Sequence, residues 1–268
     1  MNGTIKKHRA AVRANINTSK GSRTPDQTRD EDLEDLDLHR ELAGLTVKVS
    51  SLSDWMIYNE IFVERIYDRA IAEALSEAPI DRMLHVLDLG ANVGYFAMRF
   101  SQMVFDSDCP DRSFFVQCVE GSPGVCADLS ERIGVNPRLN GHVAIQHGLV
   151  GKTSGSADIY ESAFGAGNST IPQHWSKPSK VPYIDLNLLV PDAEPIALLK
   201  CDIEGSEQSF QDHYHTLLRR TQCAVVELHH GHINPDNFSE GMRSLGFSKH
   251  DVLWESKVDQ NSLVLYRR

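Results

Sequence analysis

The chain has 268 residues, 41% of them hydrophobic and 24% charged, and its formal net charge is −10 at pH 7. This composition is typical of a globular protein with one large domain or two small ones, and no window approaches the roughly 18 apolar residues of a membrane span. The acidic charge argues against binding of nucleic acid, whose partners carry basic surfaces. Because the five cysteines form no C-x-x-C pair, we expect reduced thiols in a cytoplasmic protein. From the absence of a span and from the acidic charge, we expect contact with neither membrane nor nucleic acid.

The first forty residues differ in charge from the rest of the chain. Residues 1–29 carry seven Lys or Arg and one Asp, whereas residues 30–37 carry six acids and no base. Few of these residues are apolar, and such a composition favours disorder. We therefore expect a polar segment over 1–40, disordered or loosely helical, and one domain over 41–268.

Apolar spacing predicts the elements that follow. Residues 42–75 begin with a short alternating stretch and continue with helical spacing. From residue 83 onward, strand-like and helix-like runs alternate, which favours a doubly wound, mostly parallel α/β sheet with helices on both faces. The last two strands are joined only by "SKVDQN", too short for a helical crossover, so we expect them to pair antiparallel at one edge. The predicted strands are 83–89, 114–120, 143–147, 196–202, 222–228, 248–254 and 262–267, and the predicted helices are 94–104, 123–134 and 206–219.

Residues 151–195 interrupt this alternation. They are rich in Gly, Ser, Pro and Asn, and a loop of this length inside a compact domain is usually functional or disordered. "SADIYES" within it has the pattern of an extra strand. We expect "AFGAGNSTIP", residues 163–172, to cover a substrate, because the stretch is too polar for the core.

The turn in "DLGANVGYF" follows one strand and precedes a helix. Gly90 and Gly94 allow a sharp turn, and ligands of open α/β sheets bind at the carboxyl ends of the strands. The spacing G-x-x-x-G lacks the glycines of a pyrophosphate site, and Asp88 would repel a phosphate but attract a cation such as a sulfonium. The alternative is a structural turn in which Asp88 caps the helix.

A second strand also ends in an acid. "FFVQCVEGSPGVCADL" places Glu120 before a turn that contains Gly121 and Ser122. A carboxylate at the end of the second strand is suited to accept both hydroxyls of a ribose. Two strand-end acids therefore fit adenosine with a positively charged tail, which describes S-adenosylmethionine.

The residues now resemble a known family. "VLDLGANVGYF" resembles motif I of the class I S-adenosylmethionine-dependent methyltransferases, and "LLKCDIEGSEQSF" is similar to the K-x-D-x-E-G-x-E signature of the FkbM-type methyltransferases. "SDWMIYNEIFVERIYD", "VPYIDLNLLV" and "AVVELHH" match the order of that family's other segments, over roughly residues 45 to 268. The resemblance implies a Rossmann-like, seven-stranded sheet with an antiparallel C-terminal edge strand. It also implies methyl transfer, usually to a hydroxyl oxygen of a sugar or secondary metabolite.

The resemblance also implies the residues that bind the cofactor. Glu120 would hold the ribose, with Gly121 and Ser122 in the following turn. Asn187 stands where the family usually has Asp, and whether Asp185 replaces that acid is open. The methionine part of the cofactor would lie against Asp88, Gly90, Ala91, Asn92, Gly94 and Tyr95, and the adenine or ribose side against His147, Gly148 and Leu149.

Charged residues at the ends of the fourth and fifth strands are the catalytic candidates. Alternation puts Lys200, Asp202 and Glu204 on one side of the fourth strand, and buried charges are costly unless paired or functional. We expect Asp202 to face both the cofactor and the reacting centre, Glu204 to orient cofactor or acceptor, and His229 to be the candidate general base. The alternative for the fourth strand is an internal Lys–Asp ion pair with Glu204 at a helix start.

Several questions stay open at this point. Asp202, Glu227 and His229 are weak candidates for a divalent metal such as Mg²⁺, because their spacing is not diagnostic. Methyl transfer to nitrogen and a non-catalytic binding protein of the same fold are the alternatives to O-methylation. The expected partner is a small-molecule hydroxyl acceptor, and the oligomeric state, a homodimer included, is left open.

Overall fold

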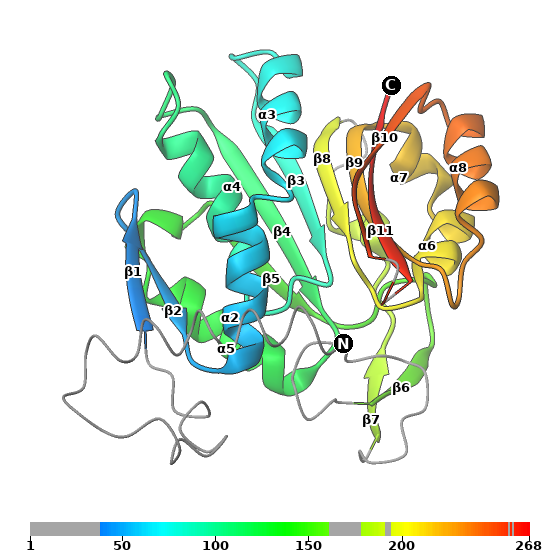
Figure 1. Ribbon diagram of the computed structural model, residues 1–268, viewed down its shortest axis with the longest axis horizontal. Helices are drawn as coiled ribbons and strands as arrows, with labels where there is room; N and C mark the ends of the chain where they lie inside the picture. Colours follow the sequence, from blue (N-terminus) through cyan, green and yellow to red (C-terminus); the bar gives the residue numbers. More distant parts are fainter. Residues whose placement is uncertain (1–37, 161–177, 191–193, 257, 259) are drawn as a thin grey trace.

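The structure is a computed structural model that describes residues 38–160, 178–190, 194–256, 258 and 260–268 (Figure 1). Of the predicted polar segment 1–40, residues 1–37 lie outside the described residues. The substrate-covering loop predicted over 163–172 lies outside them as well. Among the described residues, no helix combines the length and apolar character needed to cross a membrane.

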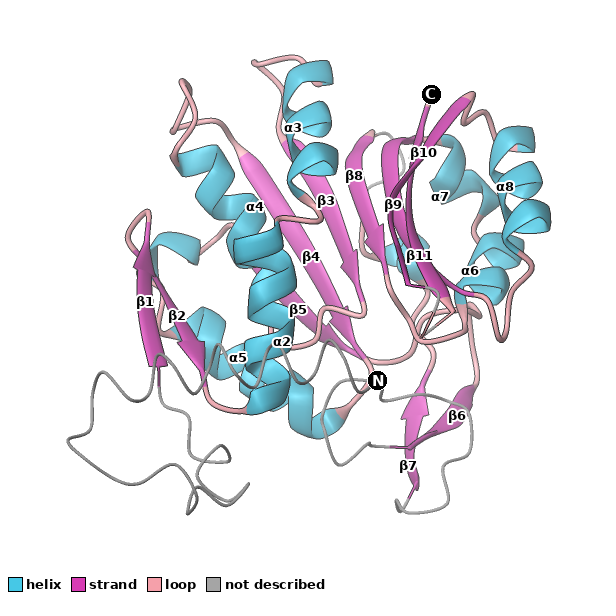
Figure 2. Ribbon diagram, in the orientation of Figure 1, coloured by secondary structure: helices cyan, strands magenta, loops and turns pink. Residues whose placement is uncertain are grey.

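A seven-stranded sheet forms the centre of the molecule, with strand order β10-β11-β9-β8-β3-β4-β5 (Figure 2). The pairs from β9 to β5 are parallel, whereas β11 runs antiparallel to both of its neighbours. The strands are β3 (Leu84–Leu89), β4 (Phe114–Glu120), β5 (Val143–His147), β8 (Ile196–Cys201), β9 (Thr221–His229), β10 (Lys249–Ser256) and β11 (Asn261–Arg267). This confirms the predicted mostly parallel α/β sheet. The last two strands pair antiparallel as expected, and the C-terminal strand β11 lies between β9 and the edge strand β10.

Helices cover both faces of the sheet, and successive strand residues alternate between two cores. Val86 and Leu198 belong to one core, whereas their neighbours Leu87 and Leu199 belong to the other. The first core lies under α2 (Leu52–Tyr58), α3 (Asp68–Glu77), α4 (Tyr95–Phe105) and α5 (Pro123–Gly134), and the second under α6 (Glu207–His213), α7 (His215–Arg219) and α8 (Pro235–Ser244). The alternation explains why these strands read as continuous apolar runs: both faces are buried.

Three local features differ from the sequence expectation. The helix predicted over 206–219 is broken at Tyr214, whose buried hydroxyl donates to the Ile184 carbonyl oxygen at 2.8 Å. The stretch of helical spacing predicted within residues 42–75 contains a π-helix, Asn59–Glu64, which ends at Arg65 in a left-handed conformation. Helix α8 was not predicted, although Asn234 caps it and Pro235 starts it, which is a standard start signal.

Two small hairpins flank the main sheet (Figure 1). The strand predicted in "SADIYES" is present as β6 (Ser156–Tyr160), which pairs with β7 (Pro178–Pro182). At the other side, β1 (Leu38–Leu42) pairs with β2 (Leu45–Val49). Short 3₁₀ turns occupy Pro137–Leu139 and Leu186–Leu188, and Asp185 caps the second by accepting a hydrogen bond from the Asn187 backbone amide.

Candidate functional site

Loops from three neighbouring strands meet at the carboxyl edge of the sheet. The arrowheads of β3, β4 and β8 point to the same end of the sheet (Figure 2). The backbone amides of Gly90 and Ala91, just after β3, both donate to the Val119 carbonyl oxygen at 3.0 Å, and the Asp202 amide donates to that of Leu89 at 3.1 Å. The strand-end residues singled out from the sequence are therefore brought together at the place where α/β folds bind ligands.

The two glycines of the first turn are required by contacts within the protein. Gly90 has φ +73°, and a Cβ there would lie 1.8 Å from the Asp202 carbonyl oxygen. Gly94 has φ +88°, and a Cβ there would lie 2.5 Å from a methyl carbon of Leu129. Close packing of the chain on itself thus explains both glycines without a ligand, in addition to their left-handed backbone.

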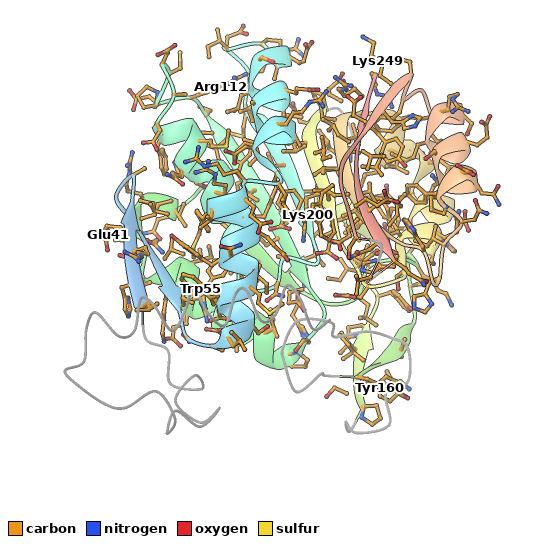
Figure 3. All side chains as sticks on the ribbon, viewed as in Figure 1. Glu41, Trp55, Arg112, Tyr160, Lys200 and Lys249 are labelled. Carbon is orange, nitrogen blue, oxygen red and sulfur yellow. The ribbon has the colours of Figure 1, made fainter. Side chains whose placement is uncertain are left out.

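Asp88 is an internal ion-pair partner of Lys200. Asp88 is fully buried, and the Lys200 Nζ lies 3.4 Å from its Oδ1 and 3.6 Å from Asp202 Oδ2. The same Nζ donates to the Gly90 carbonyl oxygen at 2.6 Å, from a position in the middle of the molecule (Figure 3). Burial raises the pKa of Asp88, against the opposing effect of Lys200. Neither oxygen of Asp88 has a hydrogen-bond partner among the described residues, so Asp88 does not cap helix α4 and the capping alternative is wrong. The Lys–Asp pair expected within the fourth strand is present between Lys200 and Asp202, whereas the pair with Asp88 was not predicted.

Glu120 ties the first turn to the second. Its Oε2 accepts a hydrogen bond from the Asn92 amide at 2.9 Å, and its Oε1 accepts one from the Ser122 amide at 2.8 Å. The side chain is buried, which raises its pKa, while these two hydrogen bonds lower it. Each carboxylate oxygen has a second lone pair, so both oxygens keep acceptor capacity toward a ligand.

The segment after β5 closes one side of this turn. His147 pairs with Glu120 across β4 and β5, and its ring Nε2 lies 3.0 Å from the Gly121 carbonyl oxygen. The Gly148 amide donates to the Glu120 carbonyl oxygen at 2.9 Å. Leu149 packs so tightly against Gly121 that a Cβ on Gly121 would lie 2.9 Å from it. The structure therefore brings all of these predicted residues to the second turn.

Tyr95 lies elsewhere, in a buried structural network. Its hydroxyl donates to the Lys48 carbonyl oxygen at 2.5 Å and accepts from Arg132 Nη1 at 3.1 Å. Arg132 in turn pairs with Asp54 at 2.7 Å. These hydrogen bonds connect α4 and α5 to β2 and α2. Only 1% of Tyr95 is exposed, so the residue presents no surface to a cofactor.

The ends of β8 and β9 form the most highly charged part of the site. Glu204 has a left-handed backbone, φ +52°, which is uncommon outside glycine, and its Oε2 lies 3.4 Å from His229 Nε2. One oxygen each of Asp202 and Glu204 and one ring nitrogen of His229 lie within 4.8 Å of one another. The predicted grouping used Glu227 instead of Glu204, but the Glu227 carboxylate accepts a hydrogen bond from the Asn261 side chain.

Glu207 contacts both His229 and the loop that carries Glu204. It is fully buried, and its Oε1 lies 3.0 Å from His229 Nδ1. The same oxygen accepts hydrogen bonds from the backbone amides of Ile203 and Gly205, both at 3.2 Å. One buried carboxylate thus holds the loop that carries Glu204 and also fixes the His229 ring. The sequence motif contains Glu207, but its role was not predicted, because the contact depends on how β9 lies beside β8.

Crowded carboxylates shift the pKa values in the cluster. Burial and the negative charge of Asp202 raise the pKa of Glu204 to about 7 and that of Glu227 to about 8. Burial lowers the pKa of His229, but the hydrogen bond to Glu207 and the surrounding carboxylates outweigh it and raise the pKa to about 10. The carboxylates around His229 therefore favour its protonated form. The role of His229 as the general base stays a prediction.

Tyr67 is a buried tyrosine whose ionisation is disfavoured by the carboxylates of the site. Only 4% of it is exposed, and its pKa is raised well above the usual value by burial and then by the negative charges of Asp202 and Glu227. Its phenol therefore stays protonated. In the sequence, Tyr67 is one of several aromatic residues between residues 55 and 67, so nothing distinguishes it from the others.

Comparison with known proteins gives a structural likeness only. No protein-family model and no curated protein sequence matches the chain. An FkbM methyltransferase from Methylobacillus flagellatus KT superimposes with a TM-score of 0.50 at 11% identity, over 74% of this chain and 47% of that one. The magnesium protoporphyrin IX methyltransferase of Synechocystis PCC 6803 gives a TM-score of 0.48 at 10% identity, over 82% of this chain and 85% of that one.

This likeness concerns the fold. The chain spans about half the length of the FkbM methyltransferase, and at such low identity only the arrangement of the backbone is comparable. The seven-stranded, mostly parallel sheet with antiparallel pairing at its C-terminal side agrees with the sheet that the sequence motifs imply, except that the C-terminal strand β11 lies between β9 and the edge strand β10. The chain therefore has the Rossmann-like fold of the FkbM-type class I methyltransferases.

Proposed function

We propose that the chain is an S-adenosylmethionine-dependent methyltransferase that acts on a hydroxyl oxygen of a small molecule such as a sugar or secondary metabolite. The observation that carries this proposal is the position of Glu120. Its two oxygens bridge the turns after β3 and β4 and keep lone pairs for two ribose hydroxyls. No pyrophosphate-binding glycine pattern accompanies this acid, which favours a nucleoside with a cationic tail over a dinucleotide.

The charge of the site supports the same ligand. Four carboxylates, Asp202, Glu204, Glu207 and Glu227, lie around His229, and burial followed by repulsion from neighbouring carboxylates, Asp202 above all, raises the pKa values of Glu204 and Glu227. The sulfonium and ammonium groups of S-adenosylmethionine are cations that would relieve this repulsion. A phosphate group would increase it.

The chemistry requires positioning and the removal of one proton. A lone pair of the acceptor oxygen forms the new C–O bond while the C–S bond breaks, and the sulfur keeps that electron pair as a neutral thioether. The acceptor proton passes to a carboxylate at the strand ends. Holding the three reacting atoms in line supplies much of the rate enhancement. Asp202, in the loop directly after β8, is the residue that we assign to this positioning.

Replacement of Glu120 tests the ribose assignment. Glu120→Gln keeps the size of the side chain but removes its charge and one acceptor oxygen. We expect the affinity for S-adenosylmethionine, measured by calorimetry, to fall by about tenfold or more, because a hydrogen bond to a charged group contributes about 1.5–3 kcal/mol. Glu131→Gln, on the exposed side of α5, is the matched control and should bind like the wild type. Equal affinity of both variants would refute the assignment.

A further inference from the structure

A group of metal-ligand type lies at the ends of β8 and β9. One carboxylate oxygen each from Asp202 and Glu204 and one nitrogen of His229 lie within 4.8 Å of one another. We propose that these three residues bind a divalent cation beside the cofactor. This inference deepens the proposed function, because the cation would lie next to the transferred methyl group. It differs from the ligand set predicted from the sequence, in which Glu227 took the place of Glu204.

The histidine is arranged as a ligand. Glu207 lies 3.0 Å from Nδ1 of His229, and Nε2 faces Glu204 at 3.4 Å. Metal-binding histidines usually donate their second ring N–H to a carboxylate, which fixes the tautomer and makes the other nitrogen a better donor. Glu207 supplies that carboxylate and also holds the loop that carries Glu204 through two amides.

A second observation concerns the free oxygen of the Glu207 carboxylate. The Oε2 atom of Glu207 has no hydrogen-bond partner among the described residues. Solvent cannot supply one, because the whole side chain is inaccessible to it. A buried carboxylate is costly unless positive charge lies nearby. Lys200 is shared between Asp88 and Asp202, so the partner of Glu207 is the His229 ring. A divalent cation bound to the other nitrogen of that ring would add positive charge beside Glu207.

The donor set favours certain ions. Two carboxylates and one imidazole suit Mn²⁺ or Zn²⁺ better than Ca²⁺ or Mg²⁺, which prefer oxygen ligands alone. Three protein ligands leave coordination positions for water or for an acceptor hydroxyl. A divalent cation in such an open site lowers the pKa of a bound hydroxyl. O-methylation has to remove the proton of that hydroxyl.

Binding of Mn²⁺ can be measured without cofactor or acceptor, so its outcome is independent of the proposed methyl transfer. We expect the full chain, stripped with EDTA, to bind one Mn²⁺ per chain in a titration followed by electron paramagnetic resonance. His229→Ala and Glu204→Gln should each weaken binding at least about tenfold, and Glu207→Gln by about 10–100-fold, because it acts through His229. His230→Ala removes the neighbouring histidine, which contacts Ser262, and should leave binding unchanged.

Several results would overturn the proposal. These are no saturable Mn²⁺ binding by the wild type, equal binding by His229→Ala and wild type, or loss of binding in Glu227→Gln with retention in Glu204→Gln. Far-ultraviolet circular dichroism on each variant separates loss of ligands from loss of fold. If Mn²⁺ binds as expected but S-adenosylmethionine does not, the metal site stands and the proposed function fails.

Discussion

Lys200 is the residue whose replacement tests the electrostatic arrangement of the site most sharply. It is the cation nearest to the fully buried Asp88, 3.4 Å away, and neither oxygen of Asp88 has a hydrogen-bond partner among the described residues. Lys200→Met keeps an unbranched side chain and removes the charge. The variant leaves a carboxylate inside the sheet without compensation, and it also removes the hydrogen bond to the Gly90 carbonyl oxygen.

The size of the effect follows from this burial. Removing one partner of a buried ion pair destabilises a protein by about 3–5 kcal/mol, because the remaining charge stays desolvated. For a domain of this size, 1 kcal/mol corresponds to roughly 2–4 °C in melting temperature. We therefore expect Lys200→Met to melt on the order of 10 °C below the wild type. The double variant Lys200→Met/Asp88→Asn removes both charges and should recover most of that loss.

Urea unfolding followed by circular dichroism, on the wild type, both single variants and the double variant, gives the coupling energy between Lys200 and Asp88. Lys249→Met, at an exposed lysine (Figure 3), is the control and should change stability by less than about 0.5 kcal/mol. A Lys200→Met variant as stable as the wild type, or a double variant no better than the sum of the two single ones, would refute the reasoning.

Three further substitutions have defined outcomes. Gly90→Ala should destabilise the fold by several kcal/mol in thermal unfolding, since its Cβ would overlap the Asp202 carbonyl oxygen, whereas Gly134→Ala, in helix α5 with open space around it, should melt at or slightly above the wild type. Tyr95→Phe should cost about 1–2 kcal/mol through its lost hydrogen bonds and leave calorimetric S-adenosylmethionine affinity unchanged; a loss of affinity without a loss of stability would indicate that Tyr95 contacts the cofactor after all. Asp202→Asn should lower both the affinity for S-adenosylmethionine and the rate of methyl transfer, and unchanged values of both would exclude Asp202 from the site.

Apolar patterning predicted the strands of the central sheet but not their full order. The strand beginning at Leu84 and the helix beginning at Pro123 lie within one residue of their predicted starts, because long buried runs bounded by turn residues leave little choice of structure. The break at Tyr214 was missed, since the tertiary hydrogen bonds of its hydroxyl are not visible in helical spacing. The insertion of β11 between β9 and β10 depends on long-range pairing, which local periodicity does not encode.

The candidate site was predictable in its residue types and less so in its contacts. Strand-end acids at 88, 120 and 202 were identified because each follows a long apolar run. Their partners were harder to identify: the sequence cannot show that Lys200 lies between Asp88 and Asp202 or that Glu207 reaches His229. Such contacts arise from the register of neighbouring strands, in which Asp88 pairs with Lys200 and Lys200 with Val225.

Crystallisation of the chain with S-adenosylhomocysteine, the demethylated product of the cofactor, tests the central claim most directly. We predict density for one molecule at the carboxyl ends of β3, β4 and β8, with the two ribose hydroxyls at hydrogen-bond distance, about 3 Å or less, from the Glu120 carboxylate. The sulfur should lie on the side of Asp202. Density with the ribose away from Glu120, or no bound ligand at about millimolar concentration, where even weak cofactor binding of Kd near 0.1 mM is saturating, would contradict the proposal that this chain is an S-adenosylmethionine-dependent methyltransferase.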